Sequence, residues 1–397
     1  MDLKMIVNTY GTPVFVYREE ILRTNVARIK KAVSTFGLEE RVHLYVPYFA
    51  NSNPHLFAVL AESGVGATLQ TKEEDAHFRA FGLEMKRIVS PTHLTDSDLE
   101  YFVGQNVPIN VGTGGNLRRL LDLGIRDLRI RVDLSLEGNQ KQGIKPSQFE
   151  AVKKLLGNRT LYGIHIYPGT SSTLELCLRY QRRALEILHH FPELKEINLG
   201  GGFYFDYEEK NDEKQHFDWV VYFSELRKRI DELGVSDNVI FVLEPGRDIL
   251  ADVGIMIVKV HALEKTFGLE YCDVYTDGSY VFIPSSTVKV RQHQLRYFSA
   301  DFQEKNEEQY NGRPVKLNGC TTLSSDRLFP GIVYVPPALC ADDYVLIEDV
   351  GAYGATQHLE FLNKAPAPEI LVRNNDLVHV ISRKGELTDR LRNVPRF

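Results

Sequence analysis

The sequence predicts two domains, a parallel (β/α)8 barrel and a C-terminal antiparallel β-domain, with the change between them near Gly254. Across residues 42–244, short apolar segments alternate with amphipathic ones, and eight strands alternating with helices is the pattern of a barrel. Beyond Gly254, segments with a period of two and intervening turn residues dominate, which is typical of antiparallel sheet. A doubly wound open sheet is the alternative for the first part.

The elements of the barrel follow from their residue patterns in chain order. A strand-like segment at residues 12–17 precedes a helical pattern over residues 18–36. β-Branched and aromatic runs between turn signals predict the eight strands at residues 42–49, 65–70, 87–90, 108–112, 128–134, 161–167, 196–200 and 238–244. Amphipathic spacing predicts helices between them at residues 72–81, 96–103, 117–123, 146–156, 174–189 and 219–233.

The β-domain is predicted from shorter segments with alternating apolar residues. Its strands are expected at residues 255–263, 274–277, 280–284, 288–292, 314–317, 344–347, 369–372 and 377–382. We expect this domain to share a sheet with the N-terminal strand. The predicted domain bounds are therefore residues 18–253 for the barrel, and residues 1–17 with 254–397 for the β-domain.

The composition is that of an ordinary soluble globular protein, with 43% hydrophobic and 25% charged residues over 397 positions. A net charge of −6 argues against nucleic acid or an anionic membrane as the main partner, because both favour a basic surface. No apolar run approaches the roughly 20 residues of a membrane span, and the N-terminus lacks the pattern of a secretory signal. The four cysteines form no C-x-x-C pair, so we expect neither a disulfide framework nor a metal site, and a cytoplasmic location.

Two strand ends carry residues that suit a phosphorylated ligand. The seventh barrel strand ends in Gly200, Gly201 and Gly202, whose backbone N–H groups can turn toward a phosphate, although a tight turn explains three glycines taken alone better. The eighth ends in Glu244, followed three residues later by Arg247. This carboxylate and guanidinium can serve a ligand at the barrel mouth or pair with each other.

The order of the motifs resembles one family over nearly the whole chain. The chain is similar to the fold-type III pyridoxal-phosphate (PLP) decarboxylases, which act on diaminopimelate, ornithine or arginine. The segments that carry the resemblance are GTPVFVY at 11–17, ANSNP at 50–54, GIHIY at 163–167, GGGF at 200–203, EPGR at 244–247, then Gly319, Ser324, Asp326 and GAY at 351–353. The resemblance implies the architecture shared with alanine racemase, a TIM-like barrel followed by a β-domain.

The resemblance also implies roles for residues. The three glycines at 200–202 would hold the cofactor phosphate, Arg247 would approach it, and Tyr353 would reach it from the partner subunit of a head-to-tail homodimer. Glu244 would lie against the pyridine nitrogen, where a carboxylate keeps the ring protonated and a better electron sink.

The chain departs from the family at the reacting groups. The family's first strand ends in the lysine that forms the Schiff base with PLP, and Phe49 stands there. A benzyl group has no amine and cannot move a proton. Tyr167 replaces a histidine that stacks on the ring, and it can still stack. Thr322 and Leu323 replace the catalytic cysteine and the acid after it.

Cys320 is close to the position of that cysteine, yet the spacing to Asp326 puts Thr322 in register with it. No residue is therefore assigned as catalytic. His165 is interpreted as a packed barrel residue rather than a base, and Arg131 either orients a ligand or forms a buried ion pair.

Three functions remain open. In the first, the site is repurposed, for example in specialised amino-acid metabolism, and binds PLP, its adduct with an amino acid or another phosphorylated small molecule without a lysine Schiff base. In the second, the chain is a non-catalytic relative that binds or regulates a partner. In the third, it is a decarboxylase that uses a displaced lysine, for which Lys72 at the next strand end is the candidate.

Overall fold

The computed structural model describes residues 2–135, 143–208, 215–265, 267–285, 292–305, 312–373 and 377–391. These residues form two compact units. The barrel unit contains Arg23–Phe205 and His216–Ile249, and the sheet unit contains Met1–Leu22, Asp206–Gln215 and Leu250–Phe397. The predicted domain bounds, residues 18–253 for the barrel and residues 1–17 with 254–397 for the β-domain, stay a prediction.

The barrel unit is built on eight parallel strands. They are β2 (Val42–Pro47), β3 (Gly66–Leu69), β4 (Arg87–Val89), β5 (Asn110–Val111), β6 (Arg129–Val132), β7 (Gly163–Ile166), β8 (Glu196–Asn198) and β9 (Ile240–Leu243). Their order is β4-β3-β2-β9-β8-β7-β6-β5, and a parallel bridge between Val89 and Ile109 joins the two ends of this order. The predicted barrel is confirmed, because an open doubly wound sheet would leave its edge strands unpaired.

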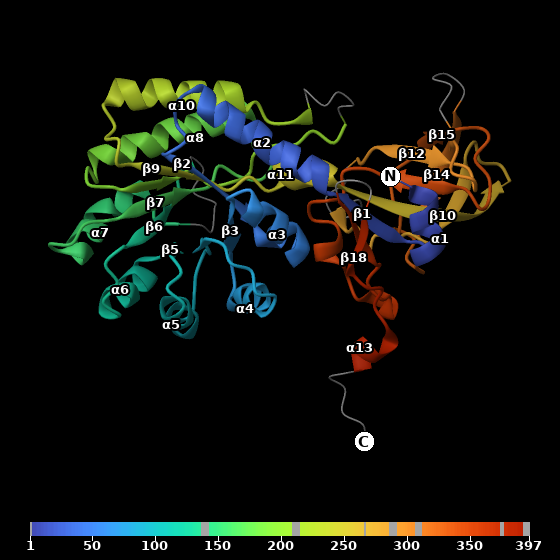
Figure 1. The fold of residues 1–397 in the computed structure, drawn as a ribbon, viewed down its shortest axis with the longest axis horizontal. Coiled ribbons are helices and arrows are strands. Elements are labelled where there is room, and N and C mark those ends of the chain that lie inside the picture. Colours follow the sequence, from blue (N-terminus) through green and yellow to red (C-terminus); the bar gives the residue numbers. More distant parts are fainter. Residues whose placement is uncertain are drawn as a thin grey trace. The chain divides into compact units, whose positions relative to one another are not determined.

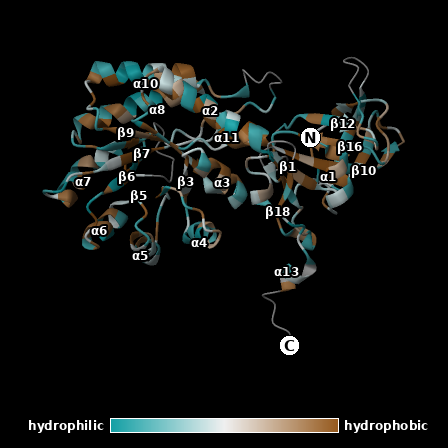
Figure 2. Ribbon diagram, viewed as in Figure 1, coloured by the Kyte–Doolittle hydropathy of each residue, from teal (hydrophilic) through white to brown (hydrophobic). Residues whose placement is uncertain are grey.

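Helices surround these strands, as Figure 1 shows. Their bounds are α2 (Glu19–Thr35), α3 (Pro54–Glu62), α4 (Lys72–Ala80), α5 (Asp96–Gly104), α6 (Gly114–Asp122), α7 (Phe149–Leu156), α8 (Leu174–Glu186), α10 (Trp219–Leu233) and α11 (Arg247–Leu250), with short 3-10 turns at Tyr48–Ala50, Pro146–Gln148 and Ile187–His189. Thr71 and Thr95 begin α4 and α5 with capping boxes that satisfy the first backbone N–H groups. Figure 2 shows hydrophilic and hydrophobic residues together on α8 and α10, as expected of amphipathic helices.

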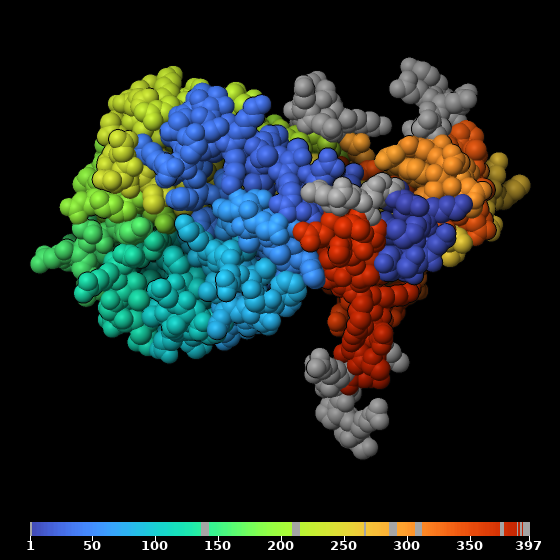
Figure 3. Space-filling model, in the orientation of Figure 1, coloured from blue at the N-terminus to red at the C-terminus, as the bar shows by residue number. Residues whose placement is uncertain are grey.

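Helix α2 lies on the surface beside α10. Figure 3 shows the blue residues of α2 next to the yellow-green residues of α10. The guanidinium of Arg28, on α2, donates to the backbone oxygen of Phe217 at 3.3 Å, two residues before α10 begins. This contact joins segments that are far apart in the sequence.

The sheet unit is a mainly antiparallel sheet that includes the N-terminal strand. Its elements are α1 (Leu3–Tyr10), β1 (Val14–Arg18), β10 (Gly254–Lys265), β11 (Cys272–Thr276), β12 (Leu295–Phe298), β13 (Glu304–Lys305), β14 (Arg313–Asn318), β15 (Val333–Val335), β16 (Tyr344–Ile347), β17 (Glu369–Val372), β18 (Val378–Ser382) and α13 (Leu387–Leu391), with 3-10 turns at Ala251–Val253, Ala355–Gln357 and Phe361–Asn363. Strand β1 pairs antiparallel with β10 and parallel with β17. The expectation that the N-terminal strand joins this sheet is confirmed.

One face of this sheet is covered by α1, which the sequence analysis did not predict. Ile6 and Val7 of α1 pack in one cluster with Val14 and Val16 of β1 and with alternate residues of the neighbouring strands. Alternate residues of a strand point to the same face, so the period-2 pattern becomes a single apolar layer. Burying each such aliphatic side chain contributes roughly 1.5–3 kcal/mol.

One of the strands predicted for this unit is wrong. Residues 280–284 form turns rather than a strand, and the buried carboxylate of Asp326 accepts hydrogen bonds there from the Ser279 hydroxyl and the backbone N–H of Tyr280. These tertiary contacts override the local preference of the segment YVFIP for extended structure. The strand predicted at residues 288–292 lies, apart from its last residue, outside the described residues.

Within the described segments, no helix is both long and apolar enough to cross a membrane.

Candidate functional site

Polar side chains meet inside the barrel unit where its strands end. Glu244 directly follows β9 and is only 6% exposed. Its Oε1 accepts hydrogen bonds from Asn198 Nδ2 at 2.7 Å and from the Ser90 hydroxyl at 3.2 Å. Asn110 Nδ2 in turn donates to the Ser90 hydroxyl at 2.9 Å. Two side chains from other strand ends, Asn198 and Ser90, therefore donate to one buried carboxylate, and Asn110 supports Ser90.

The charge state of Glu244 depends on these neighbours. Burial alone would raise the pKa of Glu244, but the contacts of His165, Asn198 and Arg131 lower this pKa below its ordinary value. His165 Nε2 lies 3.7 Å from Glu244 Oε1, and burial lowers the pKa of His165, so the imidazole is neutral at pH 7. Glu244 is therefore an ionised acceptor supported mainly by hydrogen-bond donors and by the guanidinium of Arg131.

Arg131 and His165 both belong to this cluster. Arg131 donates to the backbone oxygen of Ser90 at 2.6 Å, and its guanidinium carbon lies 5.6 Å from the ring centre of Tyr167. His165 is packed inside the barrel, as interpreted from the sequence, but it also faces Glu244.

The glycine loop, Gly200–Gly202, follows β8 and packs closely against two neighbouring strand ends. Gly200 and Gly202 have φ angles of +70° and +89°. A Cβ atom on these two residues would lie 2.0 Å from the oxygen of Ile166 and 1.8 Å from the oxygen of Gly169, and one on Gly201 would lie 2.4 Å from the oxygen of Glu244. Close backbone packing therefore requires glycine at all three positions, whether or not a phosphate binds there.

Arg247 lies beside the loop that follows β7. Its NH1 donates to the Ser171 hydroxyl at 2.9 Å, and Ser171 has a φ of +55°, which is uncommon for a residue other than glycine. The next residue, Ser172, donates its backbone N–H to the oxygen of Gly202 at 2.7 Å. Arg247, this loop and the glycine loop thus form one region of the barrel mouth.

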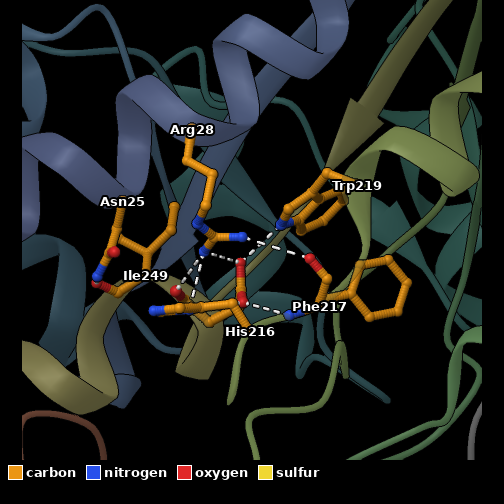
Figure 4. Close-up of polar contacts among 7 residues, drawn as sticks. Asn25, Arg28, His216, Phe217, Trp219 and Ile249 are labelled. Carbon is orange, nitrogen blue, oxygen red and sulfur yellow. Dashed lines mark hydrogen bonds and ion pairs between the residues drawn. The ribbon is translucent and has the colours of Figure 1, made fainter. Parts of the chain in front are cut away.

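A buried carboxylate holds the segment that contains Arg247. Arg28, on α2, and three residues of one later stretch, His216, Phe217 and Trp219, converge here, as Figure 4 shows. Asp248 accepts from Trp219 Nε1 at 2.6 Å, from Arg28 at 2.8 Å and from the Phe217 N–H at 2.8 Å, and it lies 3.1 Å from His216 Nδ1. Burial would raise the pKa of Asp248, but His216, Arg28 and Trp219 together lower it. This cluster fixes the start of α11.

Phe49 lies next to the same region. It is 37% exposed in the 3-10 turn after β2, between the buried Tyr48 and Ala50. A Cβ on Gly246 would lie 3.4 Å from Ala50 Cβ and 3.5 Å from Pro47, so the end of β2 packs against the segment between Glu244 and Arg247. The side chain offered at this position is a benzyl group.

Lys72, the candidate displaced lysine, is engaged elsewhere. Its Nζ lies 3.1 Å from Asp98 Oδ1, and the side chain is 43% exposed at the start of α4. The hydrogen bond to Asp98 raises the pKa of Lys72. A lysine that forms a Schiff base needs a lowered pKa, so these contacts oppose that role.

Three of the predicted site residues belong to the sheet unit. Thr322 and Leu323 are exposed in a loop whose conformation depends on Asp326, which accepts the backbone N–H of Thr321 at 2.8 Å. Tyr353 is partly buried and has a φ of +59°. Sequence reasoning placed Asp326 in the motif, and the structure gives it a supporting role in this loop.

Several residues of the barrel cluster were missed by the sequence analysis. Ser90 ends the strand predicted at residues 87–90, and ligand-binding groups of barrels gather at such positions, so a signal existed for it. Asn198 lies inside the strand predicted at residues 196–200, whereas the observed β8 ends at this residue. Ser171 carried no comparable signal, because its role depends on an unusual backbone angle. In the described part of the chain, no three His, Cys, Asp or Glu side chains gather as a metal site requires.

Comparisons with known proteins agree with this architecture. Residues 22–251 match the family described as pyridoxal-dependent decarboxylase, pyridoxal binding domain. Diaminopimelate decarboxylase of Methanothermobacter thermautotrophicus is 23% identical over 99% of this chain and 94% of its own length. L-glutamyl-[BtrI acyl-carrier protein] decarboxylase of Niallia circulans is 23% identical over 98% of this chain and 95% of its own length.

A solved structure shows the same fold. Diaminopimelate decarboxylase from M. jannaschii, in complex with L-lysine, superposes with a TM-score of 0.85 and covers 100% of this chain and 95% of that one, at 19% identity.

Proposed function

This chain belongs to the family of pyridoxal-dependent decarboxylases, and on that premise we propose that its barrel binds pyridoxal 5′-phosphate, or an adduct of it with an amino acid, without a covalent bond to lysine. The observation that carries the proposal is the buried, ionised carboxylate of Glu244. A protonated pyridine nitrogen is the complement of such a group, since it offers one N–H and one positive charge. Glu244 would hold that proton on the ring.

The neighbouring region suits the phosphate of the same ligand. Arg247 brings a buried guanidinium, Ser171 brings a hydroxyl, and the glycine loop brings backbone close to both. Helix α11 is held in place by Asp248, so Arg247 is positioned before any ligand arrives. We propose that these groups hold the phosphate, with Tyr167 against the ring.

Buried polar atoms without partners support a polar ligand in this barrel. Among the described residues, Thr68 Oγ1, Asn110 Oδ1 and His165 Nδ1 are buried and make no hydrogen bond. Unsatisfied buried polar atoms are costly, at about 1–3 kcal/mol each, so a bound molecule or ordered water that satisfies them is favoured.

The reacting groups decide what the site can do. Pyridoxal phosphate, when bound, supplies an electron sink for a carbanion. Phe49 provides an apolar wall where an amine would be needed for covalent attachment, and it cannot move a proton. Thr322 and Leu323 offer neither a thiol nor a carboxylate. The chain is therefore proposed to bind this class of ligand with chemistry unlike that of the usual decarboxylases.

The ligand class follows from the relatives. The M. jannaschii enzyme holds L-lysine, and the N. circulans enzyme is named for a glutamyl group on a carrier protein. We propose that an amino acid or its pyridoxyl adduct is the ligand here, in specialised amino-acid metabolism. We further propose a cytoplasmic, head-to-tail homodimer in which Tyr353 reaches the phosphate bound by the other copy.

A non-catalytic relative is the second candidate. The observation that favours it is that Phe49, Thr322 and Leu323 all lack groups that transfer protons or form covalent bonds with a cofactor. Such a protein would bind or regulate a partner, and it would turn over no amino acid.

Calorimetric titration tests the binding proposal. Pyridoxal phosphate, pyridoxamine phosphate and inorganic phosphate would be titrated into the wild type and into Glu244→Gln. We expect the substitution to weaken both ring ligands by roughly 1.5–3 kcal/mol, the range for a hydrogen bond to a charged group, and to leave inorganic phosphate unchanged. Equal affinity of both proteins for the ring ligands, or no binding of them, would contradict the proposal.

A further inference from the structure

We infer that Asn198 is a positioning residue that couples the two ends of the proposed ligand site, so that the glycine loop and the Glu244 carboxylate behave as one rigid frame. The identity of the ligand that this frame would bind rests on the proposed function. The contacts that build the frame are independent of that function.

The side chain of Asn198 forms one hydrogen bond in each direction. Its Nδ2 donates to Glu244 Oε1 at 2.7 Å, and its Oδ1 accepts the backbone N–H of Gly200 at 2.8 Å. The residue ends β8 and is fully buried. The orientation of the amide follows from its partners, because a carboxylate can only accept here and a backbone N–H can only donate.

A third hydrogen bond closes the frame. The backbone N–H of Glu244 donates to the oxygen of Gly200 at 2.7 Å. Gly200 is thus held by Asn198 through its N–H and by Glu244 through its carbonyl. A Cβ on Gly201 would lie 2.4 Å from the oxygen of Glu244, which leaves no room for the loop to move toward β9. A displacement at either end is therefore transmitted to the other.

Asparagine is the side chain whose chemistry suits this position. Aspartate has the same shape but no donor, so it would place a second carboxylate 2.7 Å from Glu244. Two carboxylates at that distance cannot both be ionised at low cost, and one of them takes up a proton. The titratable or charged groups that face Glu244 from the other strands are Arg131, His165 and Tyr45.

This chemistry predicts that the order of the glycine loop depends on pH in Asn198→Asp but not in Asn198→Ala. In Asn198→Asp, a proton shared by the pair at low pH keeps the hydrogen bond to Glu244. At higher pH both groups are ionised, and they repel each other and loosen the glycine loop. In Asn198→Ala both side-chain hydrogen bonds are lost at every pH, without added charge.

Hydrogen exchange of the full-length protein tests the inference without any ligand. The measured quantity is the protection factor of the peptide that contains Gly200–Gly202, at pH 5.5 and pH 8. We expect Asn198→Ala to lose at least tenfold protection at both pH values, and Asn198→Asp to lose it mainly at pH 8. Titration of inorganic phosphate should show the same pattern, although neither Asn198 nor Glu244 is proposed to touch phosphate.

Asn116 supplies the matched control. It is another buried asparagine of the barrel unit, and it bonds both the N–H and the oxygen of Leu94, at 3.1 and 2.8 Å. Asn116→Asp should leave the protection of the glycine loop and its pH dependence as in the wild type.

The outcomes separate this inference from the proposed function. Unchanged protection of the glycine loop in Asn198→Ala would overturn the inference, and this variant decides the matter if Asn198→Asp fails to fold. Wild-type protein that binds no pyridoxal phosphate, yet shows the expected exchange pattern, would overturn the proposed function and leave the frame intact.

Discussion

Glu244 and Phe49 show how single residues set the limits of this site. Glu244 is buried, which favours its neutral form, but Asn198 and Arg131 favour the ionised form more strongly. Phe49, in the 3-10 turn after β2, offers no titratable group, and its neighbours Pro47 and Ala50 lie against Gly246. The residues proposed to hold a pyridoxal ring and phosphate are thus present, whereas Phe49 offers no amine for a covalent bond.

Arg247→Ala is expected to weaken the binding of pyridoxal phosphate by roughly 1.5–3 kcal/mol, because a charge-assisted hydrogen bond to the phosphate is lost. Calorimetry measures the change. Arg229→Ala is the control, since Arg229 pairs with Glu232 on α10. If Arg247→Ala leaves the affinity unchanged, Arg247 is a structural residue.

Phe49→Lys is expected to permit covalent attachment of pyridoxal phosphate, because it places an amine at the position that the resemblance assigns to the family's lysine. Borohydride reduction followed by intact mass would detect the adduct. Release of carbon dioxide from amino acids should stay low, since Thr322 and Leu323 remain. Robust decarboxylation by this single variant would show that those two positions matter less than argued.

The glycine loop shows how close packing between elements restricts which residues a segment can contain. Each of its glycines meets a backbone oxygen of a neighbouring loop, so the sequence GGG reports tight packing as well as a possible phosphate site. The sequence alone supports both interpretations, because the identity of the neighbours comes only from tertiary structure. Ser171 illustrates the same limit, since no sequence pattern predicts its φ of +55°.

Gly202→Ala should destabilise the protein more than Gly157→Ala. Both glycines have positive φ, which costs an alanine about 1–2 kcal/mol. A Cβ on Gly202 would also lie 1.8 Å from the oxygen of Gly169, whereas one on Gly157 meets nothing within 4 Å. Urea denaturation measures the two free energies of unfolding. Equal losses would mean that the 167–172 loop moves aside easily.

At the scale of the whole molecule, the predicted architecture is confirmed, and the reason is periodicity. Eight strands alternating with helices were visible in the sequence, as was the change to period two near Gly254. Helix α1 and the turn at residues 280–284 were not predicted, because α1 is stabilised by the sheet it covers and the turn by Asp326. Site residues at strand ends, such as Glu244, were predictable from the barrel pattern. Residues in loops that contact the site, such as Ser171, were not.

Asp248 contributes to the stability of the barrel unit in a pH-dependent way. We expect Asp248→Asn to lower the free energy of unfolding by about 2–4 kcal/mol at pH 7, because Trp219 and Arg28 lose a buried charged partner. The pKa of Asp248 is lowered on folding, so its contribution is complete above the unfolded value of about 3.9 and is lost as the pH falls through the folded value.

Urea denaturation of the wild type and Asp248→Asn between pH 7 and pH 3 measures this dependence. The difference between the two proteins should shrink below about pH 4. A difference that stays constant down to pH 3 would mean that the carboxylate charge does not stabilise this cluster.

The most direct test of the central claim is an absorption spectrum of the purified protein with added pyridoxal phosphate, followed by borohydride reduction and intact mass. We predict that the ligand stays with the folded protein through gel filtration and that the denatured, reduced chain carries no added mass. A covalent adduct on the reduced chain would contradict the account by revealing a substitute lysine, and a folded protein that retains no pyridoxal phosphate would contradict it by showing that the site does not bind this ligand.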